Sequence, residues 1–134
     1  MGKRGRWALS QFLPDYLENE TIDLVIANVE NAAGGFGITE NISKKVRSYG
    51  VHVQTSGNHI WKKKEIYPLL DAEKNLLRPA NYPKGVPGHG YCTIDIKGSK
   101  VSIINLQGYL NNFIRLRCPF MEGKELARRL KKQS

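Results

Sequence analysis

The chain has 134 residues, of which 40% are hydrophobic and 25% charged, as is typical of one soluble globular domain. No apolar run approaches the roughly 18 residues that span a membrane, and the basic N-terminal segment lacks the apolar core of a signal peptide, so we expect a cytoplasmic protein. The net charge of +9 fits a polyanionic partner such as RNA, although basic residues scattered along a chain more often form a solvated surface.

The pattern of apolar residues, glycines and prolines predicts the following elements in chain order. They are a helix over residues 5–19, a strand over 23–27, a helix over 39–49, a strand over 51–55, a helix over 61–70, a short strand over 75–79, a hairpin of strands 91–96 and 100–106, and a helix over 121–132. Pro14 should bend the first helix, and Pro68 should end or kink the third. Glycine-rich loops are predicted over 28–38 and 81–90, and an irregular segment over 107–120.

Alternating strands and helices predict a largely parallel sheet with helices packed on it, to which the hairpin adds an antiparallel part. The fold class is therefore α/β with a mixed sheet, in one domain over residues 1–134. Cys92 and Cys118 form no CxxC pair, so we expect two reduced thiols and no zinc knuckle.

Two polar clusters follow predicted buried strands, at residues 28–32 and 56–59. Glu30 is a carboxylate in a loop beyond a strand, where it can bind a hard cation or serve only to cap the loop. Asn31 and Asn58 offer amide oxygens, although asparagine is also common in turns. His59 can give or take a proton near neutral pH, or can be purely structural.

Because the ends of neighbouring strands face one crevice in an open α/β sheet, we expect Glu30 and Asn58 to converge on a shared cation pocket. His89 lies in a glycine- and proline-rich loop, where it could contact a substrate. His52 falls within a predicted strand and is expected to be a packing or surface residue.

Four segments resemble a bacterial metallophosphoesterase family of the YmdB type, within the calcineurin-like superfamily. They are Asn-Val-Glu-Asn-Ala-Ala-Gly-Gly-Phe-Gly-Ile-Thr (28–39), Ser-Gly-Asn-His-Ile-Trp-Lys-Lys-Lys-Glu (56–65), Leu-Arg-Pro-Ala-Asn-Tyr-Pro (77–83) and Ile-Asn-Leu-Gln-Gly (104–108). The resemblance covers nearly the whole chain and implies a β-sandwich flanked by helices. It also implies a phosphodiesterase that hydrolyses 2′,3′-cyclic nucleotides at a centre of two divalent metal ions.

The resemblance assigns a role to each polar residue. Glu30 would contact both metal ions with Asn31 in support, Asn58 would bind the second ion, and His59 would contact the phosphate or protonate the leaving oxygen. Iron or manganese suits a mixed set of oxygen and imidazole ligands.

The chain also departs from the family pattern. The family opens with a strand that ends in Gly-Asp and has later Phe-His-Ala-Glu and Gly-Thr-His-Thr-His segments, none of which occurs here. Lys62 stands where relatives usually have an acidic residue. The chain therefore matches the N-terminal half of a metallophosphoesterase domain, so we expect weak metal binding, little or no hydrolysis, and an open sheet edge that favours association into homo-oligomers.

Two other interpretations remain open at this point. One is a degenerate, non-catalytic module that binds RNA or another polyanion through its basic surface. The other is a truncated gene product with no independent role.

Overall fold

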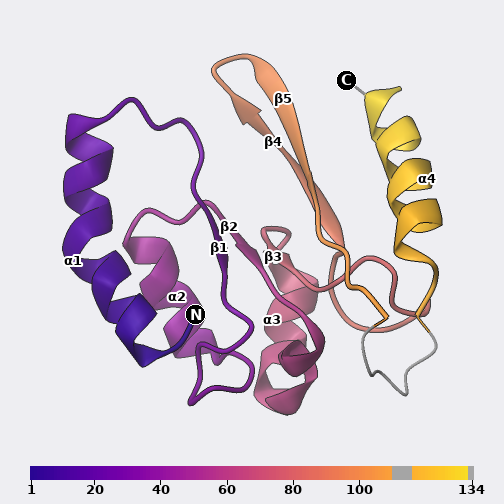
Figure 1. Cartoon of the computed structure of the whole chain (residues 1–134), viewed down its shortest axis with the longest axis horizontal. Helices are drawn as coiled ribbons and strands as arrows, with labels where there is room; N and C mark the ends of the chain where they lie inside the picture. Colours follow the sequence, from indigo (N-terminus) through magenta and orange to yellow (C-terminus); the bar gives the residue numbers. More distant parts are fainter. Residues whose placement is uncertain (110–115, 133–134) are drawn as a thin grey trace.

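The strands form two small sheets, and helices pack around them (Figure 1). The computed structural model describes residues 1–109 and 116–132. The elements in chain order are α1 (Lys3–Asn19), β1 (Ile26–Asn28), α2 (Glu40–Ser48), β2 (Val53–Thr55), the 3₁₀ helices η1 (Asn58–Lys62) and η2 (Lys64–Ile66), α3 (Tyr67–Ala72), β3 (Leu76–Leu77), β4 (Tyr91–Ile96), β5 (Ser99–Ile104) and α4 (Pro119–Lys131).

The first sheet is parallel, with strand order β1-β2-β3, and the second is the antiparallel hairpin β4-β5. Lys97 and Gly98 form the two-residue turn of the hairpin, and both have positive φ, at 51° and 83°. Backbone hydrogen bonds beyond β3 join the two sheets, for example Arg78 N to His89 O at 2.9 Å and Ala80 N to Asn105 O at 2.7 Å. The predicted α/β class, with a parallel sheet and flanking helices, is confirmed. The hairpin forms a second sheet of its own, so the parallel and antiparallel strands do not make one mixed sheet.

Strands β2 and β3 are buried on both faces of the parallel sheet, whereas β1 is largely exposed. Alternate residues of a strand point to opposite faces, so neighbouring residues of β3 pack on different sides. Leu76 packs with buried residues of α2, η1, η2 and α3, and the neighbouring Leu77 packs with Val53 and the hairpin residues Cys92 and Ile103. The fold is therefore layered, with helices on one face of the parallel sheet and the hairpin on the other. In Figure 1 the hairpin rises beside α4, which contacts β5.

A buried pair of polar side chains joins α2 to β2. Gln54 is 1% exposed, its Oε1 accepts from Ser43 Oγ, and its Nε2 donates to Ser43 O, both at 2.9 Å. Thr39 caps the N-terminus of α2, as its position predicts, by accepting from Ile42 N through its side chain at 3.4 Å.

The prediction of a helix over residues 61–70 was wrong. Two 3₁₀ turns cover its first half, and α3 begins only at Tyr67, with Pro68 in its first turn. Proline has no backbone N–H, and the N–H groups of a first helical turn have no partner within the helix, so Pro68 begins this helix instead of ending it.

The first two strands are shorter than predicted, because β1 begins at Ile26 and β2 at Val53. Just before β1, the N–H of Val25 donates to the imidazole Nδ1 of His52 at 3.0 Å, in place of a backbone carbonyl of the neighbouring strand. Of the predicted irregular segment 107–120, residues 110–115 lie outside the described residues, and the last two belong to α4.

The long helix α1 has no fully buried residue, although Leu9 and Leu13 pack against the core. It contains Pro14 and still runs from Lys3 to Asn19 as one helix. Within residues 1–109 and 116–132, no helix has the length and apolar character that a membrane crossing requires.

Candidate functional site

A cavity of about 330 Å³ lies at the carboxyl ends of β1 and β2, where open α/β sheets usually bind ligands. Its walls come from the ends of these two strands and from the segment after β5. The lining residues are Asn28, Glu30, Ser56, Gly57, Asn58, Asn105, Leu106, Gln107 and Gly108. The structure therefore brings Glu30 and Asn58 to one cavity, as the sequence predicted.

Backbone hydrogen bonds fix the loop that carries Glu30. Val29 N donates to Thr55 O at 2.8 Å and continues the ladder between β1 and β2, and Gly37 N donates to Glu30 O at 2.6 Å. Gly37 has φ +73°, and a Cβ placed there would lie 2.8 Å from His59 O. Only glycine lets this loop turn back so close to the second polar cluster.

The carboxylate of Glu30 lies directly over Gly57. A Cβ at position 57 would meet Glu30 Oε1 at 2.3 Å and Oε2 at 2.6 Å, so the carboxylate occupies the space that a side chain would need. Glu30 Oε1 also accepts from the backbone N–H of His59 at 3.3 Å. The Glu30 side chain is 22% exposed, so its oxygens remain open to the cavity.

His59 is held by its neighbours in one orientation. Its Nδ1 lies 2.6 Å from Asn31 Oδ1, and the Phe36 ring contacts it with the ring centroids 4.9 Å apart. Because an amide oxygen only accepts hydrogen bonds, we assign the proton to Nδ1, which leaves Nε2 free to bind or to take a proton. His59 borders the cavity through Glu30, whose Oε1 lies 4.0 Å from Nδ1.

Asn105 also belongs to the site, although the sequence did not predict it as a site residue. Its Nδ2 donates to Ser56 O at 2.8 Å and to Leu77 O at 3.1 Å, so it ties the end of β5 to the ends of β2 and β3. Ser56 Oγ also donates to Leu77 O, at 2.7 Å. The signal for Asn105 was present in the segment Ile-Asn-Leu-Gln-Gly (104–108), where an asparagine directly follows a strand.

The loop after Asn105 is held by the fully buried side chain of Asn81. Asn81 Nδ2 donates to Gln107 O at 2.8 Å, and Asn81 Oδ1 accepts from Gln107 N at 3.0 Å. Tyr82 Oη donates to Gln107 Oε1 at 3.3 Å, and burial raises the pKa of this phenol. Tyr82 therefore stays protonated and a donor at neutral pH.

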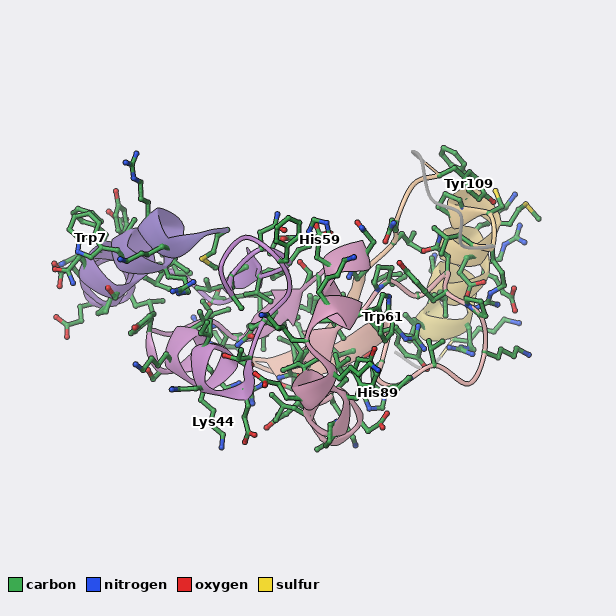
Figure 2. All side chains as sticks on the ribbon, turned by 90° about the horizontal axis from the view of Figure 1, so that it is seen from below. Trp7, Lys44, His59, Trp61, His89 and Tyr109 are labelled. Atoms are coloured by element: carbon green, nitrogen blue, oxygen red, sulfur yellow. The ribbon has the colours of Figure 1, made fainter. Side chains whose placement is uncertain are left out.

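The structure does not bring His89 to this cavity. Its Nε2 lies 3.2 Å from Asp71 O, and it is not among the residues that line the cavity. Figure 2 shows the labelled His59 and His89 well apart. The predicted contact of His89 with a substrate stays a prediction.

The side chains of the cavity supply part of a metal-ligand set. Glu30 provides a carboxylate and Asn58 an amide oxygen, which suit hard cations, whereas Asn31 Oδ1 is already engaged with His59. Within residues 1–109 and 116–132, no group of three or more His, Cys, Asp and Glu side chains could hold a metal ion. Glu30 and Asn58 are therefore suitable ligands for a metal ion, but they make up only part of the set that such an ion needs.

Two solved structures share the fold, and one of them is a phosphatase. A crystal structure of a novel phosphatase from Mycoplasma pneumoniae superposes with a TM-score of 0.87 at 29% identity, and the match covers 96% of this chain and 47% of that one. A hypothetical protein from Thermus thermophilus superposes equally well, with a TM-score of 0.87 at 35% identity over 96% of this chain and 49% of the other. The class of protein is thus a mixed α/β fold of the phosphatase type.

The particular family is defined by sequence. The profile of the YmdB-like protein family matches residues 1–134, so the chain belongs to this family. A relative from Bacillus subtilis (strain 168), the 2′,3′-cyclic-nucleotide 2′-phosphodiesterase, is 39% identical over 127 residues, which cover 94% of this chain and 47% of the relative. The chain therefore spans about half the length of the relatives it matches.

Proposed function

We propose that this chain is part of a metal-dependent phosphodiesterase that acts on 2′,3′-cyclic nucleotides. One observation carries the proposal: Glu30 and Asn58 line one cavity at the carboxyl edge of the parallel sheet, and His59 is held beside Glu30. The name of the Bacillus subtilis relative supports the choice of substrate.

Glu30 and Asn58 would hold the metal ions, with iron or manganese as the expected pair. When bound, two such ions polarise the phosphoryl oxygens of a diester and supply a hydroxide near neutral pH. Gly57 has no side chain, and the Glu30 carboxylate fills the space that is left at the cavity wall. This position supports the role of Glu30. Asn58 contributes a neutral oxygen and thus binds without adding charge.

His59 would contact the phosphate or protonate the leaving oxygen through Nε2. The hydrogen bond from Nδ1 to Asn31 supports this role, because it holds the ring in one tautomer and one orientation. We therefore assign Asn31 to the positioning of His59, in addition to the metal-supporting role that the family resemblance implies.

We expect the 134 residues alone to bind metal weakly and to hydrolyse little or nothing. Among the described residues a single carboxylate lines the cavity, and it offsets little of the charge of two divalent cations. The outer edge of β1 pairs with no strand in the described part of the chain, so we also propose that this edge favours association with further chains. A cytoplasmic location and one domain over residues 1–134 remain predictions.

The test is a calorimetric titration of the chain with Mn²⁺, together with hydrolysis of adenosine 2′,3′-cyclic phosphate. Wild type is compared with Glu30→Gln, Asn58→Ala and His59→Ala, and the exposed Glu65→Gln serves as the control for loss of one carboxylate. We expect Glu30→Gln and Asn58→Ala to weaken Mn²⁺ binding by roughly tenfold or more, and His59→Ala to leave it nearly unchanged. Any Mn²⁺-dependent turnover should disappear in all three variants.

Mn²⁺ binding that survives both Glu30→Gln and Asn58→Ala would contradict the proposed site. Turnover that persists in these variants would do the same. No metal binding at all, together with tight and steeply salt-dependent RNA binding, would favour the non-catalytic module instead.

A further inference from the structure

A second cavity, of about 240 Å³, lies between the start of α4, the loop after β3 and the first residues of β4. Its lining is rich in charge. It includes four cations, Arg78, Lys84, Arg117 and Arg129, and two carboxylates, Glu122 and Glu125. We call it the α4 cavity.

One of the four cations is neutralised inside the protein. Arg117 forms a bidentate ion pair with the buried Glu122, with Nη2 to Oε1 at 2.8 Å and Nη1 to Oε2 at 2.7 Å. The other three differ in this respect. Among residues 1–109 and 116–132, no carboxylate lies within ion-pair distance of Arg78, Lys84 or Arg129.

Arg78 is held in place by backbone oxygens. Its Nη1 donates to Pro79 O at 2.9 Å and to Ala80 O at 3.5 Å, and Arg117 Nη2 donates to the same Ala80 oxygen at 3.2 Å. Two guanidinium groups therefore converge on one carbonyl. Burial and the charge of Arg117 lower the pKa of Arg78, although the group remains fully protonated at neutral pH.

The remaining two cations are exposed and available. The Arg129 guanidinium lies over the Tyr91 ring, 5.0 Å from its centroid, and so projects from α4 in a defined direction. Lys84 lies on the exposed loop opposite it. Guanidinium and ammonium groups are the side chains with which proteins bind phosphate oxygens, the first through paired hydrogen bonds and the second as a point charge.

The α4 cavity shares a wall with the candidate active site. Asn105 lines the site cavity, and its backbone bonds to two residues of the α4 cavity: Ala80 N donates to Asn105 O at 2.7 Å, and Asn105 N donates to Gly90 O at 3.0 Å. Phosphates recur at short intervals along a nucleic acid strand. A strand that extends from the candidate active site to the α4 cavity would place a phosphate in each.

We propose that the α4 cavity binds a backbone phosphate of single-stranded RNA. RNA is chosen because only a ribose 2′-hydroxyl can form a 2′,3′-cyclic phosphate, so this choice rests on the proposed function, whereas the phosphate contact does not. The proposed substrate is then an oligonucleotide that ends in a cyclic phosphate, in addition to the mononucleotide. A free inorganic anion would use the same contacts, and the experiment separates the two sources.

The test measures binding of a fluorescent single-stranded RNA of about eight nucleotides by anisotropy, in EDTA and over a range of salt concentrations. The variant is Lys84→Gln/Arg129→Gln, in which both residues are exposed. The matched control is Lys44→Gln/Lys45→Gln, which removes the same charge from exposed positions on α2. Figure 2 shows Lys44 far from α4, and circular dichroism checks that every variant folds.

We expect the α4 variant to bind RNA roughly tenfold more weakly and its salt slope to fall by about 1.4, and the control to change less than about twofold. Equal losses in both variants would refute a defined site. Inorganic phosphate that binds as tightly as the RNA would refute the polynucleotide assignment, and so would no RNA binding at all. The RNA titration is repeated in Asn58→Ala, which lacks a proposed metal ligand. The same loss on substitution of Lys84 and Arg129 in that background would show that RNA binding does not depend on metal binding or hydrolysis.

Discussion

Substitution of Gly57 by alanine should damage the site while leaving the fold intact. The new Cβ would lie 2.3 Å from Glu30 Oε1, 2.5 Å from Cδ and 2.6 Å from Oε2. Non-bonded atoms make contact at about 3.5 Å, so the carboxylate must withdraw by roughly 1 Å. Gly57 itself has φ −138°, outside the positive-φ region that favours glycine.

The two consequences of this movement differ in size. Metal–oxygen bonds span about 2.0–2.6 Å, so a displacement of roughly 1 Å removes Glu30 as a ligand, and catalytic groups displaced that far lose up to about a hundredfold in rate. Stability changes little, because the end of the Glu30 side chain can move toward solvent. The hydrogen bond lost to His59 N contributes about 1 kcal/mol, and the lower entropy of the unfolded alanine chain offsets part of it.

The assay combines Mn²⁺ titration with urea denaturation of the same samples. Gly57→Ala should bind Mn²⁺ roughly tenfold more weakly, with a free energy of unfolding within about 1.5 kcal/mol of wild type. Gly108→Ala is the matched control, since Gly108 lines the same cavity and a Cβ there meets nothing within 4 Å. A folded Gly57→Ala variant that binds Mn²⁺ like wild type would refute the placement of Glu30 at the metal.

Three further predictions concern the rest of the fold. Gly90→Ala should destabilise the protein by more than about 2 kcal/mol in urea denaturation, because its Cβ would lie 2.3 Å from a backbone Cα, and an unchanged midpoint would contradict the packing described. Ser43→Ala should cost about 1–3 kcal/mol in the same assay by leaving the buried Gln54 Oε1 without its donor, whereas a neutral effect would show that water replaces the hydroxyl. Hydrogen bonding from the backbone of the next helical turn lowers the pKa of the Cys118 thiol, and burial raises that of Cys92. Because a lower pKa gives more thiolate at neutral pH, iodoacetamide should label Cys118 roughly tenfold faster, as peptide mapping would detect, and the reverse order would overturn this account.

Long periodic segments and turn chemistry were enough to predict most of the architecture. The helix over 5–19, the cap at Thr39 and the hairpin each depend on neighbours within a few residues, and the structure confirms all three. The segment over 61–70 failed because its apolar residues are buried at helical spacing, while the chain follows a path of 3₁₀ turns. Pro68 was the available signal, because proline favours the first turn of a helix and so marks the start of α3 at Tyr67, not the end of a helix that began at residue 61.

The site shows the same division between local and distant information. Glu30 and Asn58 were predicted together because each follows a strand, and parallel strands bring such loops to one edge. Asn105 was missed because its function depends on hydrogen bonds to Ser56 and Leu77, which are distant in sequence. The pairing of Asn31 with His59 likewise depends on two loops that meet only in the folded protein.

Contacts within the protein fix the position of Glu30 in the candidate site. Gly37 and Gly57 set the approach of the two loops. The Glu30 N–H donates to the side-chain oxygen of Asn28, and the Glu30 carbonyl accepts from Gly37 N. These contacts hold the Glu30 carboxylate in place, which lowers the entropy lost when a cation binds. What this set lacks is negative charge, since two divalent cations far exceed the charge of one carboxylate. The phosphate of a bound diester would supply some of the missing charge, so in a site of this composition metal and substrate should each strengthen the binding of the other.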